Sequence, residues 1–200
     1  MSVINTQIPT QSFELVRNRI AEILLDELSN QYDLSYDDGI DVTEVSVERF
    51  VPFDITELPA VNVMLSRGML TSHSAIHSDG TYTFYIDIHH SGKTTDENRG
   101  DTLAMVKVQR LAGMCRAILE DTRYKTLGFT PPFIMNRHVE DINFDVGNDQ
   151  DMHNAVMARI TFMVRVNENV PVITPTLLAG YETSVKLSTT DKGYIFSIAP

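Results

Sequence analysis

The sequence predicts an α+β fold, in which a mostly antiparallel β-sheet packs against two long α-helices, with a C-terminal extended arm or hairpin. Two observations support this prediction. Apolar residues recur at three- and four-residue spacing in two long segments, as on the buried side of a helix. Five other segments alternate apolar and polar residues, as strands with one buried face do. The expected order is therefore helix, three strands, helix, two strands and arm.

The two predicted helices span residues 10–31 and 101–125. Gly128 follows the second, as expected where a helix ends. Cys115 is the only cysteine, so no disulfide can form within the chain, and a reducing compartment is expected. Because Cys115 falls on the apolar stripe of the second helix, we expect it to be a small core residue and not a nucleophile.

The predicted strands span residues 42–51, 58–68, 81–90, 138–147 and 154–169. Residues 69–80, which are rich in Ser, His, Asp and Gly, are expected to form a loop. The expected domain organisation is an N-terminal arm over residues 1–9, the α+β domain over 10–169, and a C-terminal extension over 170–200. Two prolines at the start of that extension favour an extended arm, although its last twenty residues are also compatible with a hairpin.

The composition of the chain argues against two classes of function, tight binding of nucleic acid and insertion into a membrane. The chain has 200 residues, of which 42% are hydrophobic and 22% charged, and its net charge is −11. Wrapping nucleic acid requires a basic surface, so the chain is a poor candidate for binding DNA tightly. No apolar run approaches the roughly 18 residues of a transmembrane helix, and the N-terminus lacks the pattern of a signal peptide. We therefore expect no membrane partner.

Motifs of catalysis are missing from the sequence, which contains no glycine-rich phosphate loop, no G-x-S-x-G, no HExxH and no paired C-x-x-C. The acidic turn around Asp37, Asp38 and Gly39 lacks the closing glutamate of a calcium loop. The histidines offer a weaker alternative, a small metal-binding α+β domain that uses His73, His77, Asp87 and His89. Its spacing matches no known ligand frame, so we predict no enzyme, no cofactor and no metal.

Surface or interface contacts are the favoured role of the histidines. Arg159 and Arg165 flank Met163 on the polar side of the last strand, where they are either solvated charges or part of an interface, since Arg and Met are enriched in interfaces. The two alternatives are equally supported. The candidate interface residues are His89, His90, Lys93, Arg99, Arg159, Met163 and Arg165.

The element order resembles that of the tail terminator (tail completion) proteins of long-tailed bacteriophages and of neighbouring neck proteins. The matching segments are SFELVRNRIAEILLDEL (12–28), LPAVNVMLSRG (58–68), TYTFYIDIHHSGK (81–93), GDTLAMVKVQRLAGMCRAILEDTRYKTLG (100–128) and ARITFMVRV (158–166). The likeness covers roughly residues 10–168 and rests on pattern, not on an invariant signature.

This resemblance implies a virion structural protein in the phage tail or neck, assembled in the host cytoplasm. Such proteins form homohexameric rings that cap the tail tube, stop its polymerisation and join the tail to the head connector. The implied partners are further copies of the chain, the tail tube protein, the head connector or neck protein and, in contractile tails, the sheath protein. DNA passes through the ring without specific binding. The alternative within this family is a head-completion or collar protein of the neck.

Overall fold

The computed structural model describes residues 8–35, 41–42, 44–74, 77–92, 99–146, 155–168, 181–186 and 193–198. The chain divides into two compact units, Met1–Val170 and Pro171–Pro200. Lys93 and the acidic turn at 37–39 lie outside the described residues.

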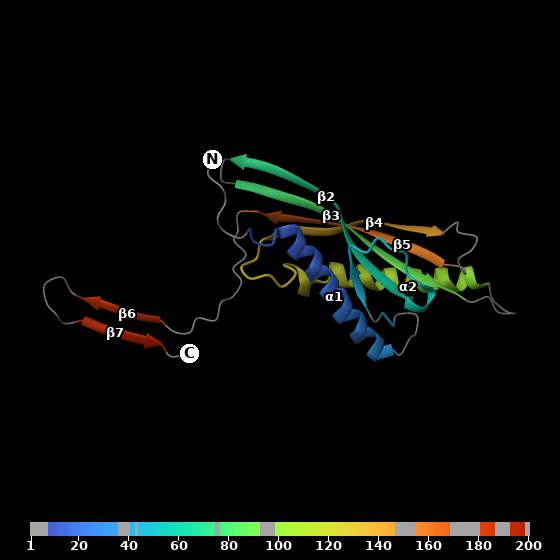
Figure 1. The fold of residues 1–200 in the computed structure, drawn as a ribbon, viewed down its shortest axis with the longest axis horizontal. Coiled ribbons are helices and arrows are strands. Elements are labelled where there is room, and N and C mark those ends of the chain that lie inside the picture. The colour runs from blue at the N-terminus through green and yellow to red at the C-terminus, as the bar shows by residue number, and fades with distance from the viewer. Residues whose placement is uncertain are drawn as a thin grey trace. The chain divides into compact units, whose positions relative to one another are not determined.

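The larger unit contains a five-stranded sheet in the order β1-β2-β3-β5-β4 (Figure 1). Its strands are β1 (Val45–Val47), β2 (Ala60–Ser74), β3 (His77–Ser91), β4 (Ile134–Val146) and β5 (Ala155–Asn167). β1 pairs parallel with β2, whereas the other three pairs are antiparallel. The predicted fold class is therefore wrong as stated: the fold is α+β, but its sheet is mixed. Parallel pairing arises because β1 reaches β2 through a crossing connection and not through a tight hairpin.

Two α-helices cover one side of this sheet, α1 (Ser12–Ser35, 24 residues) and α2 (Gly100–Glu120, 21 residues). α2 lies against β3, β4 and β5, and α1 lies against α2, β1 and β2 (Figure 1). Two short 3₁₀ helices, η2 (Ile55–Glu57) and η3 (Thr122–Tyr124), lie in the connections. These bounds differ from the prediction of 10–31 and 101–125 by a few residues at each end.

The core fills the space between the helices and one face of the sheet. Phe84 and Phe162 are cross-strand partners at its centre, and neither is accessible to solvent. Leu24 and Leu111 bring the apolar stripes of the two helices into the same cluster. Cys115 is also fully buried there, which confirms its predicted place in the core. A side chain such as Phe162 contributes about 1.5–3 kcal/mol through burial alone.

The prediction of a loop over residues 69–80 is wrong. β2 and β3 pair from Ala60 and His89 out to Ser74 and His77, so most of this segment forms the outer part of a long hairpin. The side chains of Arg67–Ser74 are all exposed. Outside the core, a strand needs no apolar face, and the sequence therefore stops alternating although the backbone ladder continues.

β4 departs from the regular alternation predicted for the strand at residues 138–147, because its pairing with β5 is irregular. Val139 and Ile142 both pack against the core although they are three residues apart. The register shifts between Val139 and Asp141, which pair with Phe162 and Thr161. The extra residue, Glu140, is accommodated as a β-bulge, which returns the following apolar residue to the buried face.

The smaller unit contains two strands, β6 (Tyr181–Lys186) and β7 (Gly193–Ile198). They pair antiparallel, with Tyr181 opposite Ile198 and Lys186 opposite Gly193, in a separate two-stranded sheet.

Candidate protein interface on the open sheet face

The sheet has a second face, which the two helices do not cover. Because β3 and β5 pair antiparallel along their whole length, their outward residues form one continuous surface. We call this surface the open sheet face, and it comprises Met64, Asp79, Thr81, Thr83, Tyr85, Asp87, His89, Met157, Arg159, Thr161, Met163 and Arg165. Four of the seven predicted interface residues lie on it.

Arg159 and Asp87 form the strongest polar contact of the open sheet face. Arg159 Nε and Nη2 donate to Asp87 Oδ1 and Oδ2, both at 2.7 Å. The guanidinium carbon also lies 4.4 Å from the centre of the Tyr85 ring. The Asp87 side chain is 5% exposed and that of Arg159 is 35% exposed, so the acid is buried beneath a cation that still reaches solvent. This hydrogen bond raises the pKa of Arg159, which stays charged.

A second ionic cluster lies further along the same face. Arg165 Nη2 donates to Asp79 Oδ2 at 2.7 Å, and His73 Nε2 lies 3.0 Å from the same oxygen. The Arg165 hydrogen bond, followed by the contact with His73, lowers the pKa of Asp79. The two arginines are six positions apart on β5, which corresponds to about 20 Å along the strand. The face therefore presents two cations at a fixed spacing.

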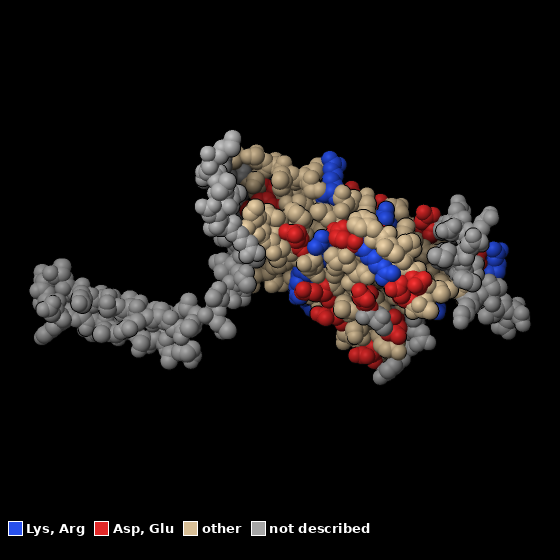
Figure 2. Space-filling model, in the orientation of Figure 1, with Lys and Arg blue, Asp and Glu red and all other residues tan. Residues whose placement is uncertain are grey.

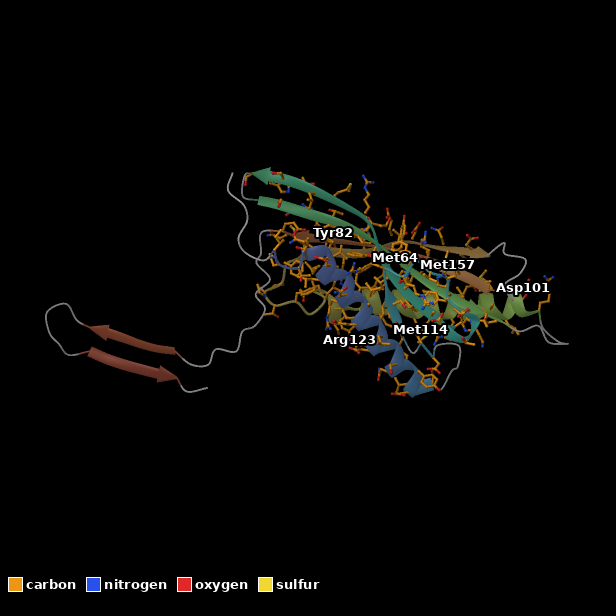
Figure 3. All side chains as sticks on the ribbon, viewed as in Figure 1. Met64, Tyr82, Asp101, Met114, Arg123 and Met157 are labelled. Atoms are coloured by element: carbon orange, nitrogen blue, oxygen red, sulfur yellow. The ribbon has the colours of Figure 1, made fainter. Side chains whose placement is uncertain are left out.

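Methionines supply the apolar part of the face. Met64 on β2, and Met157 and Met163 on β5, are each partly exposed. Figure 3 marks Met64 and Met157 at the sheet, whereas Met114 belongs to helix α2 below it. Arg, Met and Tyr are the residue types that protein interfaces favour, because they combine contact area with adaptable or directional contacts.

His89 lies where the connection between β1 and β2 folds over one end of this face. Its ring is 5.1 Å from the ring of Phe53, which in turn lies 4.1 Å beneath the Arg49 guanidinium. Arg49 is held through its backbone, which exchanges hydrogen bonds with the side chain of Asn62. Burial lowers the pKa of His89, so its ring is neutral at neutral pH.

The remaining predicted interface residues lie elsewhere. His90 faces the helices, is 5% exposed, and has Nδ1 2.7 Å from the carbonyl oxygen of Ser91. It is therefore a core residue, because adjacent residues of a strand point to opposite faces. Arg99 precedes α2, is exposed, and pairs with Asp101 at 2.9 Å. Neither belongs to the open sheet face.

The described residues of the alternative metal site lie at two separate places along the β2–β3 hairpin. His73 lies beside Asp79, whereas Asp87 and His89 are eight or more residues further on, about 26 Å away. Both acids are already paired with arginines. Within the described ranges, no group of three or more His, Cys, Asp or Glu side chains is close enough to hold a metal ion. The side chain of His77 is outside the described residues.

Several acidic side chains gather on the exposed side of α1. Figure 2 shows Asp and Glu gathered over the region of α1, whose exposed residues include Glu22, Asp26 and Asp33. The exposed residues of α2 include Lys107, Arg110 and Arg116, so the helix layer carries both signs of charge. The open sheet face combines paired charges with methionine and tyrosine.

Comparisons with models of protein families and with curated protein sequences each found no match. None of the helices in the described part of the chain is both long and apolar enough to span a bilayer.

Asp87 and Tyr85 are residues of the open sheet face that were not predicted as interface residues from the sequence, where Asp87 was considered only as a metal ligand. Their alternation with Phe84 and Ile86 already placed them on the polar side of a strand. The missing information was that β3 and β5 are neighbours, with Asp87 opposite Arg159.

Proposed function

We propose that this chain is a tail terminator of a long-tailed bacteriophage, which forms a ring on the end of the tail tube, stops its polymerisation and joins the tail to the head connector. The proposal assigns the chain a structural role in the virion, with no catalytic step and no cofactor. It rests on the resemblance in element order and on the open sheet face.

The open sheet face is the observation that supports this proposal most. A closed ring needs a heterologous contact, in which one surface of each subunit meets a different surface of the next. A face that carries Arg159 over a buried Asp87, with Met163 and Tyr85 around it, has the composition of such an interface. The Arg159 side chain is 35% exposed, so its guanidinium can also bind a carboxylate of the neighbouring copy.

The acidic charge is compatible with passage of DNA. A net charge of −11 per chain gives a ring of several copies a strongly negative field. Phosphates are repelled by such a surface, so DNA moves through the lumen without being held. The expected partners are therefore the tail tube protein below the ring, the head connector above it and, in a contractile tail, the sheath protein.

Light scattering tests the ring. The purified chain is expected to have a mass near six times 22.5 kDa, or to be a monomer that forms a ring only in the presence of tail tubes. Arg159→Glu places a negative charge above Asp87 and should dissociate the ring. Arg116→Glu on α2 is the matched control, because Arg116 lies on the helix layer. Equal dissociation of both variants, or of neither, would contradict the use of the open sheet face.

Tube assembly tests the tail role directly. Purified tail tube protein is polymerised with and without the chain, and tube lengths are measured by electron microscopy. Capping should stop elongation and place one ring on one end of each tube. Binding to purified head connector without any effect on tube length would instead indicate a head-completion or collar protein. A chelator-sensitive monomer that carries one metal per chain would indicate the metal-binding alternative.

A further inference from the structure

A polar cavity lies between the turn that follows α2 and the first part of strand β4. Its volume is about 380 Å³, which falls in the size range of small-molecule sites. β4 is the last strand in the sheet order, so the cavity adjoins an edge of the sheet. We call it the β4 cavity. The hydrogen-bond donors in its lining are the side chains of Thr122, Lys125, Thr126, Asn136, Arg137 and His138.

The charge of the β4 cavity is opposite to that of the whole chain. Lys125 and Arg137 line it with positive charge, and Glu120 is the one carboxylate in its lining. Oε2 of Glu120 already accepts a hydrogen bond from Arg116 Nε at 3.1 Å. The net charge of the chain is −11, so a cavity with more cations than anions is unusual for it. Such a cavity favours an anionic ligand.

Arg137 is the cation of the β4 cavity whose position is fixed. Its Nη2 donates a hydrogen bond to the carbonyl oxygen of Asp121, whereas its Nε is buried and donates to no group of the described residues. The charges that favour its ionised form are those of the Asp121 and Glu120 carboxylates. Each of these carboxylates is hydrogen-bonded to another arginine, Arg123 and Arg116 respectively. The guanidinium of Arg137 is therefore held in place without a carboxylate of its own.

The partial burial of this guanidinium has a cost that an anion would offset. Burial lowers the pKa of Arg137, because the charged form loses hydration that the protein replaces only in part. An arginine nevertheless stays ionised at neutral pH, so the charge itself remains. A buried charge is stable when it is paired and hydrogen-bonded, and an anion in the cavity would supply both.

We propose that the β4 cavity binds the phosphoryl group of a small phosphomonoester. Arg137 and Lys125 neutralise its charge, and the neighbouring hydroxyl and amide groups donate to its remaining oxygens. This inference does not depend on the proposed tail role, because it concerns a ligand held by a single copy of the chain.

The number and kind of donors favour a phosphoryl group over a carboxylate. Arg137 presents a planar fork of N–H groups and Lys125 a compact point charge, and both bind phosphate oxygens. Thr122, Thr126 and Asn136 add neutral donors. A carboxylate has fewer oxygens to accept these bonds and carries a single charge. A phosphomonoester offers three strong acceptor oxygens and a charge of about −1.5 to −2 at pH 7.

The apolar part of the lining favours an ester over free phosphate. Ile134 and Met135 also border the β4 cavity, and the Met135 side chain is 53% exposed. A bare phosphate ion is too small to fill a cavity of about 380 Å³ and gains nothing from these two side chains. The organic group of an ester can cover them, and burial of apolar surface adds to the affinity. A flexible methionine adapts to ligands of different shape.

Isothermal titration calorimetry with three probes tests the proposal on the full chain at pH 7 and constant ionic strength. The probes are phenyl phosphate, benzoate, which has the same ring with a carboxylate, and inorganic phosphate. Phenyl phosphate should saturate one site per chain. Benzoate should bind at least about tenfold more weakly, because it makes fewer charge-assisted hydrogen bonds. Inorganic phosphate should also bind more weakly than phenyl phosphate, because it leaves the apolar lining uncovered.

Three results would overturn the proposal. The first is the absence of saturable binding of phenyl phosphate. The second is binding of benzoate as tight as that of phenyl phosphate, which would indicate a carboxylate site. The third is binding of inorganic phosphate as tight as that of phenyl phosphate, since the ligand would then be the free ion and not an ester. The tail role is measured separately by tube capping without these probes, so the two proposals can fail independently.

Charge-removing variants locate the site. Arg137→Gln and Lys125→Gln should each weaken the binding of phenyl phosphate by at least about tenfold, as loss of a charge-assisted hydrogen bond does. Arg110→Gln is the matched control, because it removes the same charge from an exposed position on α2 and should leave the affinity unchanged. Lys125 is exposed, so its replacement preserves the fold even if Arg137→Gln does not. Equal weakening by Lys125→Gln and Arg110→Gln would indicate general charge attraction, and unchanged binding by Lys125→Gln would place the ligand elsewhere; either result would refute the β4 cavity as the site.

Discussion

The Arg159–Asp87 pair should contribute measurably to stability as well as to the open sheet face. The perturbation is a double-mutant cycle of Asp87→Asn and Arg159→Met. The Asp87 side chain is only 5% exposed, and removal of the arginine leaves this carboxylate without its cation. In a fully buried pair, the loss of one partner lowers the free energy of unfolding by about 3–5 kcal/mol. Since Arg159 is one-third exposed, water replaces part of the contact, and we expect about 3 kcal/mol for Arg159→Met.

The coupling energy between the two positions isolates the contact itself. Two hydrogen bonds of 2.7 Å to charged groups, discounted for the exposure of Arg159, give an expected coupling of about 2 kcal/mol. The exposed pair Arg116 and Glu120 on α2 is the reference, with an expected coupling of about 0.3–0.5 kcal/mol.

Urea unfolding at pH 7 measures both cycles. Each variant is unfolded at two protein concentrations tenfold apart, because an effect on association would appear as concentration dependence. A coupling for Arg159 and Asp87 no larger than that of the reference pair would refute the reasoning. The buried carboxylate would then be stabilised by other neighbours of the sheet and not by the arginine.

Three further outcomes are expected. Phe162→Ala should lower the free energy of unfolding by about 3–5 kcal/mol in urea titrations, whereas Phe144→Ala, at a half-exposed site, should cost much less. The Cys115 thiol should react with a disulfide reagent at pH 8 only on unfolding, because burial raises its pKa; prompt reaction would contradict this. Because Arg165 lowers the pKa of Asp79, their contact should stabilise the protein above about pH 4 and be lost as the pH falls through the folded pKa. Arg165→Met and the native chain should therefore converge in stability once the pH has fallen below the folded pKa of Asp79, and a difference that stays constant throughout an acid titration would count against it.

Much of the helix layer could be predicted from the sequence. The stripe on α1 that includes Ile20 and Leu24, and the stripe on α2 that includes Leu111, are all buried as the three- and four-residue spacing indicated. The spacing works because the side of a helix on which a residue falls depends only on its neighbours along the chain.

The sheet was harder to predict in two places. The outer part of the β2–β3 hairpin has no core to cover, so it lacks the alternation that identifies strands. β1 has only three residues, too few for any pattern to indicate whether its partner runs parallel or antiparallel. In both cases the pairing is set by backbone hydrogen bonds, which the side-chain pattern does not record.

By itself, the sequence determined which side of α1, α2, β3 and β5 is apolar, and it placed Arg159, Met163 and Arg165 together on the polar side of one strand. Only the tertiary structure decided that β5 lies beside β3, which brings Arg159 to Asp87 across 72 positions of the chain. The physical reason is that local backbone geometry decides on which side of a helix or strand a side chain lies. The choice of neighbouring strand depends instead on the packing of the whole core, to which α1, α2 and every strand of the sheet contribute at once.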